Sequence, residues 1–135
     1  MCHGSAGEIR LSPSAKKEYD KLETSKDPNA VQQRTQLKRF FERFCTSGEI
    51  SLSPEQFRRE GTYPGHNGRK IGIWCFKPWQ WRLYGAILEV MGKKTFVGVK
   101  VDPAKKQNKA DQALLKAAAN AIAELEEHKK ESERS

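Results

Sequence analysis

The chain has 135 residues, the size of one ordinary domain and long enough to bury a single hydrophobic core. Its 25 lysines and arginines outnumber its 17 aspartates and glutamates, which gives a formal net charge of +8. A surface of that charge attracts polyanions, so nucleic acid is the leading partner class, and a solvated surface without a specific partner is the competing interpretation.

The cysteines and histidines give no pattern typical of a metal or disulfide framework. The three cysteines are odd in number, widely spaced and without a CxxC pair, which predicts reduced thiols. The three histidines are equally scattered, so we expect no metal and no other cofactor. No apolar run approaches the roughly 20 residues that span a bilayer, and the first residues lack the hydrophobic stretch of a signal peptide. The sequence therefore predicts a cytoplasmic protein without a membrane partner.

The N-terminal half predicts a short strand followed by two helices. After a polar head, residues 8–11 alternate polar and apolar side chains, as a strand does. Ser12-Pro13 and Asp27-Pro28 each place a capping side chain before a proline, which is the start signal of a helix. The second helix is expected to end near Ser47-Gly48. The predicted apolar faces consist of Ala15, Tyr19 and Leu22 in the first helix, and of Val31, Leu37, Phe40, Phe41 and Phe44 in the second.

The middle of the chain predicts a turn and a loop. Ser53 to Gln56 fit a capping box, which favours one short helical turn that carries Phe57. Residues 61–68 contain Gly, Pro, His and Asn and are typical of a loop.

The C-terminal half predicts a sheet and a last helix. Residues 70–76, 81–90 and 94–101 are rich in β-branched and aromatic residues, and their short connections favour an antiparallel meander. Asn108, with Asp111 three residues later, is the candidate cap of the last helix, and the charged tail from about residue 126 is expected to fray. The apolar stripe of that helix is expected to contain Ala110, Leu114, Ala118, Ile122 and Leu125. One α+β domain over residues 1–135 is therefore predicted.

Three segments carry a resemblance to a known family. Residues 9–19 (IRLSPSAKKEY) look like an opening strand and a Ser-Pro-capped helix, and residues 68–74 (GRKIGIW) with 81–84 (WRLY) look like a basic central strand and the start of the next. Residues 99–110 (VKVDPAKKQNKA) look like a closing strand and a Lys-rich turn. In this order the segments resemble the RelE/ParE superfamily of toxin–antitoxin toxins, including its HigB-like and phage-encoded branches.

The resemblance implies a fold and a function. The implied fold is α+β and RelE-like, with an N-terminal strand and a helical hairpin packed on an antiparallel sheet with a C-terminal helix. The implied function is the toxin of a type II toxin–antitoxin system, a metal-independent mRNA endoribonuclease acting on the ribosome, with an acidic, partly disordered antitoxin as partner. The segment 46–67 is longer than the family pattern, and no Tyr or His stands near the C-terminus, where several family ribonucleases keep one.

Those departures leave two non-catalytic alternatives open on the same scaffold. One is a binding protein of the gyrase-inhibitor kind, and the other is a phage-derived RNA-binding module that lost catalysis.

Cleavage of RNA by its own 2′-hydroxyl needs a base, positive charge on the phosphorane and a donor to the leaving oxygen. Arg82, which lies among apolar residues of a strand, is the candidate ligand of the scissile phosphate. Lys70, which matches the family's catalytic-strand lysine, is the candidate base, and Arg69 is the third predicted catalytic residue. The predicted RNA-binding residues are Lys77, Trp79, Tyr84, Lys100, Lys105 and Lys106.

The expected positions of Lys77 and Trp79 follow from the geometry of a strand and its hairpin loop. Lys77 ranks below Lys70 because side chains alternate along a strand, so the two face opposite sides unless a bulge intervenes. Trp79, in a predicted hairpin loop, is the aromatic residue expected to be exposed. For every predicted basic residue the competing interpretation is a solvated side chain or a phosphate contact without catalysis.

Overall fold

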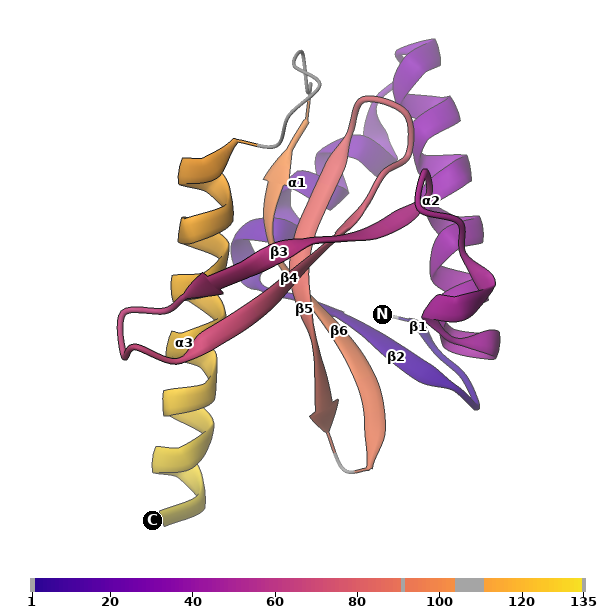
Figure 1. Ribbon diagram of the computed structural model, residues 1–135. Helices are drawn as coiled ribbons and strands as arrows, with labels where there is room; N and C mark the ends of the chain where they lie inside the picture. Colours follow the sequence, from indigo (N-terminus) through magenta and orange to yellow (C-terminus); the bar gives the residue numbers. More distant parts are fainter. Residues whose placement is uncertain (1, 91, 104–110, 135) are drawn as a thin grey trace.

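The computed structural model describes residues 2–90, 92–103 and 111–134. This part of the chain forms a six-stranded mixed sheet with helices on both faces (Figure 1). The strand order is β1-β2-β6-β5-β4-β3. The strands are β1 (Cys2–His3), β2 (Gly7–Leu11), β3 (Phe57–Pro64), β4 (Lys70–Phe76), β5 (Arg82–Val90) and β6 (Lys93–Asp102). The helices are α1 (Pro13–Thr24), α2 (Pro28–Ser47), the short 3-10 helix η1 (Glu49–Ser51) and α3 (Gln112–Arg134).

The predicted helix starts at Pro13 and Pro28 are confirmed. The Ser12 hydroxyl accepts a hydrogen bond from the Ala15 amide at 3.3 Å, and the Asp27 carboxylate accepts one from the Asn29 amide at 2.9 Å. These bonds satisfy amides that have no partner within the helix. α2 ends at Ser47 as predicted, because Gly48 adopts a φ of 82° that side-chain-bearing residues rarely take.

The sheet separates two hydrophobic cores of different composition. The face under α1 and α2 is rich in aromatic rings, and Phe44, Phe57, Phe76 and Phe96 contact one another there. The face under α3 combines strand residues with small helix residues. Its members include Ile71, Ile73, Cys75, Tyr84, Leu115, Ala118, Ala119, Ile122 and Ala123.

The predicted three-stranded meander is confirmed, and the prediction of a purely antiparallel sheet is wrong. β4, β5 and β6 pair antiparallel in sequence order, but β2 lies parallel to β6 because the α1–α2 hairpin carries the chain across one face between β2 and the later strands. Two strands were also missed. β1 is only two residues long, and β3 contains Gly61 and Pro64 and is interrupted by a bulge at Glu60, so neither shows regular alternation.

The predicted C-terminal helix is confirmed, but its buried face differs from the predicted apolar stripe. Asp111 caps α3 through the Ala113 amide at 2.9 Å, and the helix continues to Arg134 where a frayed tail was predicted. Leu115 is buried in place of Leu114, and Leu125 is 38% exposed. The predicted cap Asn108 and stripe residue Ala110 lie outside the described residues. Among the helices described, none combines the length and the apolar character needed to cross a membrane.

Candidate nucleic-acid interface

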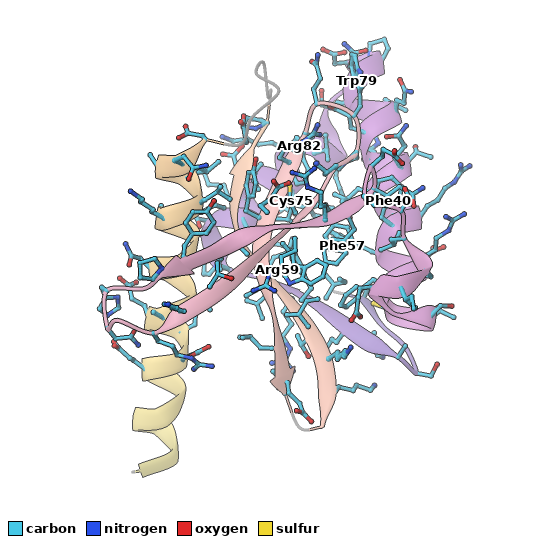
Figure 2. All side chains as sticks on the ribbon, in the orientation of Figure 1. Phe40, Phe57, Arg59, Cys75, Trp79 and Arg82 are labelled. Carbon is cyan, nitrogen blue, oxygen red and sulfur yellow. The ribbon has the colours of Figure 1, made fainter. Side chains whose placement is uncertain are left out.

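A cleft of about 480 Å³ lies between α2 and the loop that joins β4 to β5. We call it the basic cleft, because four cationic side chains and one carboxylate line it. In Figure 2, Phe40 of α2, Trp79 of the loop and Arg82 at the start of β5 lie on this side of the molecule. The complete lining is Gln36, Arg39, Phe40, Arg43, Glu55, Gln56, Lys77, Trp79 and Arg82.

Helix α2 supplies the two most exposed cations of the basic cleft. Arg39 and Arg43 are four residues apart and therefore lie on the same face of the helix, one turn from each other. Both are exposed, and in the described part of the chain neither forms an ion pair. Phe40 between them turns into the aromatic core and fixes the rotation of the helix. Two guanidinium groups are thus held toward solvent at the cleft.

Lys77 is a largely buried cation of the basic cleft. Its ammonium lies 3.4 Å from the Glu60 carboxylate, and the two side chains are only 15% and 6% exposed. The bulge in β3 places Glu60 there, and the Lys77 amide donates to the Gln56 carbonyl at 2.8 Å, which fixes the end of β4. A buried cation needs such a partner because its desolvation is costly. Lys77 therefore brings a largely compensated charge to the cleft.

Arg82 holds the loop that carries Trp79. Trp79 has a φ of 49°, a left-handed conformation that is unusual for a bulky residue, and its side chain is 46% exposed. Arg82 Nη1 donates to the carbonyl oxygen of Trp79 and, at 3.2 Å, to that of Trp81. Strained backbone persists where its surroundings over-determine it. Nη1 of the guanidinium therefore fixes the loop, while Nε is buried without a hydrogen-bond partner in the described part of the chain.

The predicted catalytic residues do not come together. Arg69 and Lys70 lie at the beginning of β4, and Arg82 lies beside its end, roughly 20 Å away at the rise of an extended strand. Arg69 forms an ion pair with Glu126 of α3. Lys70 is exposed and does not line the basic cleft. The structure therefore does not bring Lys70, Arg82 and Arg69 together in one site.

Tyr84 was predicted to contact RNA and instead belongs to the core under α3. It is 1% exposed, so its ring cannot stack on a base. Burial, followed by the nearby Cys75 and Glu60, raises the pKa of the Tyr84 phenol above its ordinary value. Lys100 pairs with Tyr84 across β5 and β6, on the face away from α2, and does not line the cleft. Lys105 and Lys106 lie outside the described residues.

The structure therefore groups Lys77, Trp79 and Arg82 and adds residues that the sequence interpretation missed. Gln36, Arg39, Phe40 and Arg43 follow the spacing of three and four residues that defines one helical face. A helical projection of α2 therefore places these four residues on one face, beside the apolar stripe.

Neither the family models nor the curated proteins contain a match to this chain. Within the described ranges, no group of three or more His, Cys, Asp or Glu side chains is arranged to hold a metal ion. Membership of the RelE/ParE superfamily therefore stays a proposal that rests on the segment pattern and the order of elements.

Proposed function

We propose that this protein binds single-stranded RNA in the basic cleft, on a scaffold of the RelE/ParE kind. The observation that carries the proposal is the convergence of Arg39, Arg43, Lys77 and Arg82 with the exposed ring of Trp79 on one cleft. Guanidinium groups bind phosphates, and aromatic rings stack on unpaired bases. A cytoplasmic location, which the sequence predicts, is part of the same proposal.

Single strands fit this cleft better than duplexes. Proteins recognise double-stranded RNA mainly by shape over a long surface, whereas unpaired bases can be splayed out and stacked on a ring. Trp79 stands at the tip of a loop, where one base can reach its face. The four cations line the same cleft as that ring.

A second candidate function is the ribonuclease toxin that the resemblance implies. The observation that favours it is Glu55, an exposed carboxylate in the lining of the same cleft. Glu55 replaces Lys70 as the candidate base for the 2′-hydroxyl proton, while the guanidinium groups stabilise the phosphorane. Attack of the 2′ oxygen on phosphorus would leave a 2′,3′-cyclic phosphate and a free 5′-hydroxyl. The substrate would be mRNA on the ribosome, and an acidic antitoxin would cover the basic cleft.

Binding is tested with a short labelled single-stranded RNA at several salt concentrations. If about four phosphates are neutralised, log K should fall with log salt at a slope of about −3. The double variant Arg39→Gln/Arg43→Gln should bind about tenfold or more weakly and lower the slope by about 1.4. Lys17→Gln/Lys26→Gln removes two exposed charges elsewhere and serves as the matched control. An equal loss in both double variants, or no binding by the wild type, would contradict the proposal.

Cleavage is tested on the same RNA and in a translation reaction. New mRNA ends that vanish in Glu55→Gln, with binding retained, would support the ribonuclease. Intact RNA and unchanged translation would exclude it and leave the binding function. A change in DNA supercoiling without any RNA product would instead support the gyrase-inhibitor alternative.

A further inference from the structure

A second hollow, of about 350 Å³, opens on the other side of Trp79. It lies between the α1–α2 turn and the loop before β5, and Trp79 lines both this hollow and the basic cleft. We call it the amide hollow, after the side chains of Asn29, Gln33 and Gln80 in its wall. Because one exposed ring forms a wall of each, a ligand that stacks on Trp79 can reach from one into the other.

The two depressions differ in charge. Among the described residues, four cations and one carboxylate line the basic cleft, whereas two carboxylates, Glu18 and Asp27, and one cation, Lys21, line the amide hollow. Lys21 is already paired with Glu18 at 3.2 Å. A phosphate is therefore favoured on one side of Trp79 and disfavoured on the other. A neutral group with hydrogen-bonding edges suits the amide hollow.

Gln33 is the residue that points to such a ligand. It is a polar residue of α2 with only 7% of its surface exposed, and it lines the amide hollow. In the described part of the chain its side-chain amide forms no hydrogen bond, and its nitrogen and oxygen are not among the buried polar atoms that lack a partner. Water in the hollow therefore reaches the amide. A ligand in the hollow would replace that water and bond to the same amide.

We propose that the two depressions form one RNA site divided by Trp79, with the phosphates in the basic cleft and one unstacked base in the amide hollow. This inference rests on the proposed RNA binding and adds base selectivity to it. The carboxylates of Glu18 and Asp27 accept hydrogen bonds, and the Gln33 amide both donates and accepts. Adenine and cytosine present an exocyclic amino group with two N–H donors to such acceptors, whereas uracil presents only its ring N3–H. The site therefore prefers adenine and cytosine to uracil.

The test compares short homopolymers of adenylate, cytidylate and uridylate of equal length, which carry the same number of phosphates. The wild type should bind the adenylate and cytidylate strands about fivefold more tightly than the uridylate strand, the value of one good hydrogen bond. Gln33→Met keeps the side-chain length and removes the amide, so the preference should fall below about twofold. Gln32→Met, at an exposed position one residue earlier, is the matched control.

The possible results separate this inference from the proposed function. RNA binding without a base preference, or a preference that Gln33→Met leaves intact, overturns the amide hollow and keeps the basic cleft. Absence of RNA binding overturns both. Glu18→Gln is the second variant, because Glu18 lies on α1 and its loss does not disturb the packing of α2. Glu18→Gln should also lower the ratio of the affinity for the adenylate or cytidylate strand to that for the uridylate strand. An unchanged ratio would contradict the inference.

Discussion

The two ends of β4 carry basic residues in opposite surroundings. At the beginning, Arg69 and Lys70 are exposed, and Arg69 pairs with Glu126 of α3. At the end, Lys77 is largely buried against Glu60, and its neighbour Arg82 holds a strained loop. The sequence shows comparable cations at both places. The structure makes one end a solvated surface and the other the wall of a cleft.

The surroundings of a charge therefore decide its role more than its place in a motif. An exposed ion pair contributes little because water and salt screen it. A buried cation has a fixed position, and removal of its partner leaves an uncompensated charge. The end of β4 is therefore where substitutions should affect both stability and binding, and the beginning is where they should affect neither.

The largest expected effect is that of Lys77→Ala. The Glu60 side chain is only 6% exposed. After this change its remaining ion pair in the described part of the chain is with the exposed Arg58, whose Nη2 lies 3.5 Å from Glu60 Oε2. We expect the free energy of unfolding to fall by about 3 kcal/mol, as for other broken buried pairs. Urea denaturation measures this loss.

Lys70→Ala, at the other end of the same strand, is the control for that experiment. Lys70 is exposed, so its truncation should change the unfolding free energy by less than about 0.5 kcal/mol. The double variant Lys77→Met/Glu60→Gln removes both charges and should recover most of the loss. Equal destabilisation by Lys77→Ala and Lys70→Ala would show that the two ends do not differ.

The next largest effect is expected for Arg82→Lys. A lysine cannot reproduce the guanidinium bonds to the Trp79 and Trp81 carbonyls, and hydrogen bonds to charged groups contribute about 2 kcal/mol. We therefore expect a loss of that size, together with greater quenching of tryptophan fluorescence by acrylamide as the loop loosens. Arg69→Lys keeps its ion pair and should change neither quantity. Unchanged quenching in Arg82→Lys would contradict the loop-holding role.

Much of the fold could be predicted because local signals agreed with tertiary structure. The Ser12-Pro13 and Asp27-Pro28 caps and the period-two strands each identify an element without reference to the rest of the chain. The sequence did not predict β3, because this strand is stabilised by pairing with β4 and by burial of Phe57, whereas its own residues are typical of a loop. The parallel pairing of β2 with β6 joins residues far apart in sequence, so no local pattern contains it.

The candidate site could be predicted only in part for the same reason. Lys77, Trp79 and Arg82 are close in sequence around one hairpin, and that proximity brought them together. Arg39 and Arg43 join them through the packing of α2 on the sheet, which sequence spacing does not show. The separation of Lys70 from Arg82 follows from antiparallel pairing, since Leu83 pairs with Phe76 at the far end of β4.

Tyr84 pairs with Cys75 near the end of β4, and its phenol makes the stability of the protein depend on pH. Its folded-state pKa is raised, first by burial, so its proton is held more tightly in the folded protein than in the unfolded chain. The contribution of this group is fully present below the ordinary tyrosine pKa of about 10 and is lost as pH rises beyond it. Tyr84→Phe should therefore weaken the alkaline loss of stability. Tyr19 has a raised pKa too, so Tyr19→Phe is the comparison, and full alkaline sensitivity in Tyr84→Phe would contradict the burial of the phenol.

The smallest effect should come from breaking the Arg69–Glu126 pair at the beginning of β4. Arg69 is 56% exposed and Glu126 is 15% exposed, so water reaches the pair and we expect Glu126→Gln to cost about 0.5 kcal/mol. That loss should shrink further as salt is raised to about 0.5 M, because a Debye length of a few ångströms screens exposed charges. The effect of Lys77→Ala should persist in the same salt, because burial protects that pair. A salt-insensitive loss of several kcal/mol in Glu126→Gln would mean that α3 is anchored by this pair and not by its alanine-rich face, and that the two ends of β4 are alike in energy.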